Sequence, residues 1–144
     1  MNQSLETQYT VVGPTPLYGS MRVGGAKNAS YKLMIAALLG TEPSRLLNFS
    51  HISDVSLVAE IISSLGAQAH TIGERAYLID PQGLSESQVD SRYGQGSRAS
   101  TMFIPPLLAK FGQAKVPYPG GDKIGTRSLE RHFDGLIALG AKVN

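Results

Sequence analysis

The sequence predicts an α/β fold built from a repeated unit, and three observations predict it. The composition, with 42% hydrophobic and 17% charged residues in 144, is that of a globular domain able to bury a core. Helical patterns alternate with short strand patterns along the chain. The same order of elements then occurs twice, and Leu-Gly-Ala at 65–67 returns at 139–141. We therefore expect two β-α-β-α-β-β-like units made by duplication, one over about residues 15–85 and one over about 86–144.

The first unit opens with a strand and a helix. Residues 20–23 are a strand candidate, and Asn28 is placed to cap a helix that runs through Leu39. Gly40 closes this helix. A short strand is expected next, over residues 45–49.

A second helix and a hairpin complete this unit. The helix begins at Ser53 or Asp54 as N-cap and ends at about Leu65, with apolar residues at the i, i+3, i+4, i+7 spacing. Two strands, 67–72 and 76–79, then form a hairpin around a short turn that contains glycine.

The second unit repeats this order and is unfinished. It has a helix over residues 98–111, a strand over 115–118 and a helix over 129–139. Pro105 and Pro106 lie inside the first of these, so that helix either kinks there or begins at the prolines. The hairpin expected after residue 141 is missing, so the chain looks like a fragment of a longer protein.

Composition and charge exclude several classes of protein. The chain has no Cys, which excludes disulfide scaffolds, zinc ribbons and thiol catalysis. A net charge of +2 without a basic run gives no support for nucleic-acid binding. The N-terminus lacks a signal peptide, and no apolar run approaches the roughly 20 residues that span a bilayer. We therefore expect a cytoplasmic protein with no membrane or nucleic-acid partner, and the three scattered His residues give no metal-site pattern.

Two corresponding positions in the two units carry a cation at the start of a helix. Lys27 follows Gly24-Gly25, and Arg98 holds the equivalent position in the second unit. A helix N-terminus offers unpaired N–H groups and a positive dipole end, and glycine lets the backbone approach a ligand closely. If the units pack side by side, both cations can face one cleft suited to a phosphorylated ligand. The alternative is a capped helix with a solvated lysine.

The extra residues of the second unit fall in a glycine-rich loop, residues 119–125. Asp122 follows two glycines in this loop, and Arg127 comes shortly before the last helix. A carboxylate on a mobile loop near cations is suited to act as a general acid or base. The alternative is an Asp in a solvent-exposed turn.

These residues resemble the UDP-N-acetylglucosamine 1-carboxyvinyltransferases of the enolpyruvyl transferase family. The matching segments are Gly25-Ala26-Lys27-Asn28-Ala29, Arg98-Ala99-Ser100, 107–112 and the Pro-Gly-Gly-x-x-Ile-Gly-x-Arg loop at 119–127. The resemblance extends from about residue 9 to residue 143. It implies a two-domain inside-out α/β barrel, of which residues 1–144 would be a partial N-terminal part.

The resemblance also implies an activity and a set of site residues. The family transfers the enolpyruvyl group of phosphoenolpyruvate to the 3-hydroxyl of UDP-N-acetylglucosamine, the first committed step of peptidoglycan synthesis, without a metal or organic cofactor. The catalytic residues implied are Asp122 as general acid, with Lys27 and Arg127 as electrostatic stabilisers. The substrate-binding residues implied are Lys27, Asn28, Arg98, Arg127, Ser128, Leu129, Glu130 and Arg131.

The sequence departs from the family at two places and in length. Asp122 stands where the loop usually has Cys, so we expect no adduct at a sulfur and no sensitivity to the epoxide antibiotic fosfomycin. The usual Pro-Val-Asp-Leu is replaced at 128–131, which puts side-chain contacts to the nucleotide in question there. The second domain is missing, so the isolated chain should lack turnover. The alternative is a non-catalytic single-domain module that binds a UDP-sugar or another anion.

Overall fold

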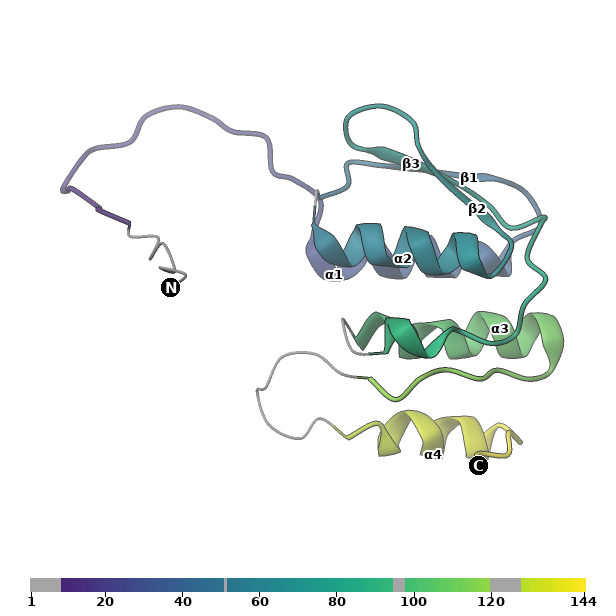
Figure 1. Ribbon diagram of the computed structural model, residues 1–144. Coiled ribbons are helices and arrows are strands. Elements are labelled where there is room, and N and C mark those ends of the chain that lie inside the picture. Colours follow the sequence, from purple (N-terminus) through teal and green to yellow (C-terminus); the bar gives the residue numbers. More distant parts are fainter. Residues whose placement is uncertain (1–8, 51, 95–97, 120–127) are drawn as a thin grey trace, which may run out of the picture.

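The computed structural model describes residues 9–50, 52–94, 98–119 and 128–144, and it stacks a small sheet and helices in layers. The sheet covers one side of the paired helices α1 and α2 (Figure 1). A segment made of the 3₁₀ helix η3 and helix α3 lies on the other side of that pair, and α4 lies beyond it. The expected α/β class is confirmed.

The sheet has three antiparallel strands in the order β1-β3-β2. They are β1 (Ser44–Leu47), β2 (Gln68–Thr71) and β3 (Ala76–Asp80). Ala69 pairs with Ile79 in the hairpin, and Ser44 pairs with Ile79 on the opposite edge of β3. Ile79 is fully buried against the helices. The predicted hairpin is thus confirmed, and the strand predicted at 45–49 forms one residue earlier and ends at Leu47.

The two helices of the first unit are present, but their N-caps differ from those predicted. Helix α1 (Lys27–Ala36) continues into the 3₁₀ helix η1 (Ala37–Leu39), and α2 covers Ser53–Ser64. Ala26 is the N-cap of α1, and its carbonyl accepts bonds from both the backbone N–H and the hydroxyl of Ser30. The prediction of Asn28 as cap is therefore wrong.

The prediction of Ser53 or Asp54 as the N-cap of α2 is also wrong. Ile52 occupies that position, and its carbonyl accepts from the N–H groups of Val55 and Ser56. Ile52 is half-buried and packs against the hydrophobic core. Packing of this side chain thus fixes the start of the helix without a side-chain cap, and Ser53 and Asp54 lie in the first turn.

The segment η3–α3 resolves the question raised by the two prolines. The 3₁₀ helix η3 (Arg98–Phe103) leads into α3 (Ile104–Phe111), whose first turn contains the prolines. Proline is accepted in a first turn because the N–H that it lacks would have no partner in the helix. The α-helix therefore begins at the prolines. Gly112 ends it in the left-handed conformation, with φ 68°.

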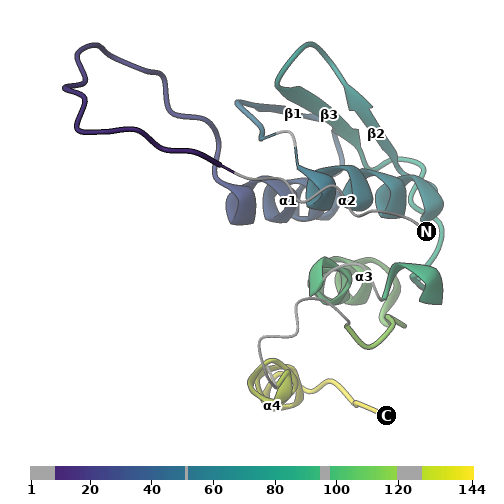
Figure 2. The same cartoon turned by 60° about the vertical axis from the view of Figure 1, so that its left-hand side comes forward.

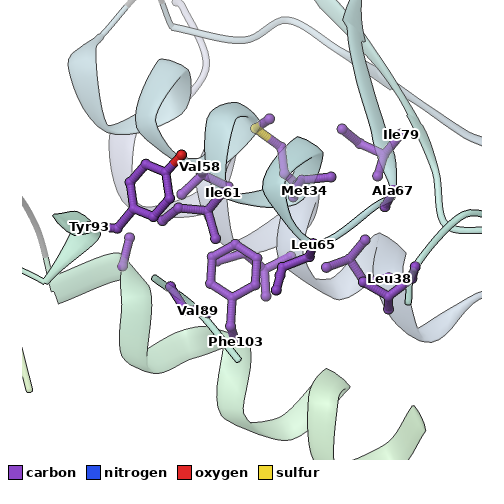
Figure 3. Packing of buried hydrophobic residues seen from close by; sticks show 14 of the residues in the cluster. Met34, Leu38, Val58, Ile61, Leu65, Ala67, Ile79, Val89, Tyr93 and Phe103 are labelled. Atoms are coloured by element: carbon purple, nitrogen blue, oxygen red, sulfur yellow. The ribbon is translucent and has the colours of Figure 1, made fainter. Parts of the chain in front are cut away.

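The core lies where η3 meets the helix pair. Phe103 projects from η3 toward Ile61 and Leu65 of the α2 region, and Leu38 lies nearby (Figure 3). All four side chains are almost completely buried. The segment η3–α3 therefore covers the face of α1 and α2 that the sheet leaves open.

Two predicted strands do not form. Residues 20–23 have no strand structure, and Met21 and Val23 are 86% and 77% exposed in an arm that leaves the body of the molecule (Figure 2). Residues 115–118 make only an isolated parallel bridge between Lys115 and Gln88. A strand needs a neighbouring edge to pair its N–H and C=O groups, and no strand lies beside either segment among the described residues.

The last helix, α4 (Glu130–Ala138), confirms the helix predicted at 129–139. None of the residues within α4 is fully buried, whereas Leu129, just before it, is 5% exposed. In the described part of the chain, no helix is both long and apolar enough to cross a membrane. The division into units at residues 15–85 and 86–144 stays a prediction.

Candidate functional site

Four helical segments begin at one edge of the molecule. Helices α1, α2 and α4 and the 3₁₀ helix η3 all start at the left-hand edge in Figure 1. Helix α1 packs against both α2 and η3. The N-terminal ends of these segments therefore face the same side of the molecule, and each favours an anion within reach of its own first turn.

Gly24 and Gly25 hold the start of α1 against the turn that follows β1. A Cβ on Gly25 would overlap the carbonyl oxygen of Asn48, and the hydroxyl of Ser50 donates a hydrogen bond to the carbonyl oxygen of Gly25. A Cβ on Gly24 would lie 2.5 Å from Nη2 of Arg75. Gly25 thus lies close to the protein's own backbone and Gly24 close to the side chain of Arg75, whereas the close approach that we predicted was to a ligand.

Arg75 connects this turn to the hairpin. Its Nε donates to the carbonyl oxygen of Phe49 at 3.0 Å, and the N–H of Phe49 donates to the carbonyl oxygen of Arg75 at 3.0 Å. The tip of the hairpin, the turn after β1 and the start of α1 therefore form one hydrogen-bonded frame. This frame fixes where Lys27 begins its helix.

Lys27 is paired with an acid from the neighbouring helix. Its Nζ lies 2.8 Å from Oδ2 of Asp54, which belongs to the first turn of α2. The side chain of Asp54 is 17% exposed and that of Lys27 is 60% exposed. The side chain of Asp54 is thus mostly buried, whereas that of Lys27 remains accessible to solvent.

Asn28 and Arg98 lie in the first turns of two helical segments, α1 and η3, that pack against each other. Asn28 is an exposed residue in the first turn of α1, one position after Lys27. Arg98 is the first residue of η3 and is half-buried; its carbonyl oxygen accepts a bond from Thr101 Oγ1 at 2.9 Å. The structure brings the starts of α1 and α2 together through the pair of Lys27 and Asp54, and η3 packs against both helices.

The segment 128–131 begins α4 at this edge. The hydroxyl of Ser128 accepts from the N–H of Glu130 at 3.0 Å, and Leu129 is buried. A groove of about 310 Å³ runs between α4 and the start of α3. Its lining includes Met102, Ile104, Leu129, Arg131, Phe133 and Leu136. The lining is mostly apolar, and its polar residues are Thr101, Arg131 and His132.

Two predicted site residues, Asp122 and Arg127, lie outside the described residues. Within the described ranges, no group of three or more His, Asp or Glu side chains could hold a metal ion. Sequence reasoning missed Asp54 as the partner of Lys27 and Arg75 as part of the frame. Neither has a local signal, because each contacts residues more than twenty positions away in the chain.

Comparisons with known proteins agree on one family. The model of the EPSP synthase (3-phosphoshikimate 1-carboxyvinyltransferase) family matches residues 11–144. The UDP-N-acetylglucosamine 1-carboxyvinyltransferase of Coxiella burnetii is 40% identical over 134 residues, which are 92% of this chain and 31% of that protein. The protein with the same name from Cellvibrio japonicus is 32% identical over 136 residues, 94% of this chain and 32% of that protein.

The fold has a counterpart among solved structures. The enolpyruvyl transferase NikO from Streptomyces tendae superposes with a TM-score of 0.60 at 24% sequence identity, over 67% of this chain and 22% of that chain. The likeness concerns the fold alone. The chain spans about a third of the length of the curated relatives that it matches.

Proposed function

Because the chain belongs to the EPSP synthase family of enolpyruvyl transferases, we propose that it supplies one wall of the active site of a UDP-N-acetylglucosamine 1-carboxyvinyltransferase. The observation that carries this choice is the 40% identity to the Coxiella burnetii protein of that name over 92% of this chain. The loop pattern at 119–127 supports the same choice. Such a protein would act in the first committed step of peptidoglycan synthesis.

The proposed substrates are phosphoenolpyruvate and UDP-N-acetylglucosamine. Lys27 and Asn28, at the accessible start of α1, would bind phosphoenolpyruvate and the sugar. Arg98 and Arg127 would add positive charge around the two substrates. The segment from Ser128 through Leu129 and Glu130 to Arg131 would hold the uridine nucleotide, in large part through backbone groups.

The proposed reaction balances as an addition followed by an elimination. Asp122, as general acid, gives a proton to the methylene carbon of phosphoenolpyruvate. The 3-hydroxyl oxygen of the sugar forms a bond to the neighbouring carbon and loses its proton. The resulting tetrahedral intermediate then loses a proton from the new methyl group, its carbon–oxygen bond to phosphate breaks, and phosphate leaves. Lys27 and Arg127 would stabilise the negative charge of the phosphate throughout.

Binding is the first test, because it can be measured on this chain. Isothermal titration calorimetry of phosphoenolpyruvate and of UDP-N-acetylglucosamine should detect saturable binding that Lys27→Ala weakens about tenfold or more, as expected when a charge-assisted hydrogen bond is lost. Lys32→Ala is the matched control, because Lys32 is an exposed lysine further along the same helix. Equal losses in the two variants would contradict a site at the start of α1.

Turnover is the second test, and it needs the other wall of the cleft. Phosphate release is measured with the protein that the complete reading frame encodes, once as the wild type and once as the variant Asp122→Ala. We expect release that requires both substrates and falls by at least two orders of magnitude in the variant. Undiminished release by Asp122→Ala would remove the general acid. Binding without any turnover in the longer protein would favour a non-catalytic UDP-sugar or anion-binding module.

A further inference from the structure

We propose that Asp54 is a positioning residue that holds the Lys27 ammonium group in place for the phosphorylated substrate. This inference rests on the proposed function, because it assigns a task to a second residue of the same site. Its basis is the ion pair of 2.8 Å between Lys27 Nζ and Asp54 Oδ2, which joins the first turns of α1 and α2.

The two partners differ in how firmly the protein holds them. Asp54 is 17% exposed, and a carboxylate in the first turn of a helix is favoured by the helix dipole. Lys27 is 60% exposed, and a lysine at the N-terminus of its own helix gains nothing from that dipole. The acid is therefore the fixed member of the pair, and the long lysine side chain is the member that is positioned.

Positioning matters because a lysine side chain has many rotamers. Ordering such a side chain costs conformational entropy, which opposes binding. A Lys27 side chain that the ion pair with Asp54 already orders loses less conformational entropy when the ligand binds. An ammonium group has three N–H donors, so one can bond to Asp54 while the exposed side of the group bonds to an anion.

The carboxylate also has an opposing effect, since it repels an anion. The anion would approach from the exposed side of Lys27, where water and salt screen this repulsion. Two variants of Asp54 distinguish the positioning of Lys27 from the repulsion of the anion. Asp54→Asn removes the charge but keeps a side-chain oxygen as acceptor, whereas Asp54→Ala removes both.

The test measures phosphoenolpyruvate affinity by calorimetry and the Lys27 ¹⁵Nζ signal by NMR, in the wild-type chain and in both variants. We expect Asp54→Ala to weaken binding about three- to tenfold, and Asp54→Asn to bind as well as the wild type or better. The Nζ signal should be resolved and slowly exchanging in the wild type and in Asp54→Asn, and should match that of exposed Lys32 in Asp54→Ala. Glu60→Gln, at an exposed carboxylate of the same helix, should change neither measurement.

Two results would overturn the proposal. One is binding to Asp54→Ala that equals or exceeds binding to the wild type, which would leave Asp54 with a repulsive effect alone. The other is a Lys27 Nζ signal that already matches that of Lys32 in the wild type. A held Lys27 signal without any phosphoenolpyruvate binding would instead refute the proposed substrate while confirming the pairing of the two side chains.

Discussion

Replacement of Gly25 by alanine tests the frame that fixes the start of α1. The new Cβ would overlap the carbonyl oxygen of Asn48, and it would lie 3.0 Å from the carbonyl carbon of Asn48 and 3.5 Å from Cα of Phe49. All three atoms are backbone atoms, so no side chain can rotate away. The φ of Gly25 is not in the left-handed region, so alanine can adopt the backbone conformation and the cost is steric.

The magnitude follows from the hydrogen bonds that must give way. Moving the turn disturbs two bonds of 3.0 Å between Phe49 and Arg75 and the bond from Ser50 Oγ to the Gly25 carbonyl oxygen. Each contributes about 0.5–1.5 kcal/mol, so Gly25→Ala should lower the free energy of unfolding by about 2–4 kcal/mol. The same variant should weaken phosphoenolpyruvate binding, because the turn positions Lys27.

Two matched glycines serve as controls in urea unfolding followed by far-UV circular dichroism. At Gly24 the atom in the way is Nη2 of Arg75, the end of a flexible side chain, so alanine there should cost less than about 1 kcal/mol. At Gly135, inside α4, nothing lies within 4 Å, so alanine should be neutral or stabilising by up to about 1 kcal/mol. Equal changes at all three positions would refute the steric argument.

Three further substitutions test the segment η3–α3 by the same unfolding measurement. Phe103→Ala should cost about 3–5 kcal/mol, because Phe103 is fully buried between η3 and the helix pair; a loss below 1 kcal/mol would show that this face is not packed. Gly112→Ala should cost about 1–2 kcal/mol, because Gly112 has φ 68° and nothing else opposes a Cβ; no loss would contradict a left-handed end to α3. Pro105→Ala should change stability by no more than about 1 kcal/mol, whereas a gain near 3 kcal/mol would place the proline inside a helix and not in its first turn.

The parts of the fold that depend on local pattern could be predicted from the sequence. The apolar spacing that ends at Leu65, the hairpin turn and the glycines that end helices each act within a few residues. The start of α3 at the prolines was one of two alternatives that the sequence left open, and the first-turn rule for proline explains the outcome.

The parts that depend on distant contacts could not be predicted. The strand expected at 20–23 has a suitable pattern, but a strand also needs an edge to pair with. The helix starts were misplaced by one or two residues, because Ser30 and Ile52 fix them through a backbone carbonyl and through burial. The pairing of Lys27 with Asp54 joins two helices and has no signature in either one.

The most direct test of a phosphate site at the common edge of the helices is an NMR titration of the ¹⁵N-labelled chain with phosphoenolpyruvate. We predict saturable shifts of the backbone amides at the start of α1, from Lys27 to Ser30, together with that of Arg98. Shifts confined to another surface, such as the one that carries Arg92 and Tyr93, would contradict the account, and so would a spectrum that the ligand leaves unchanged.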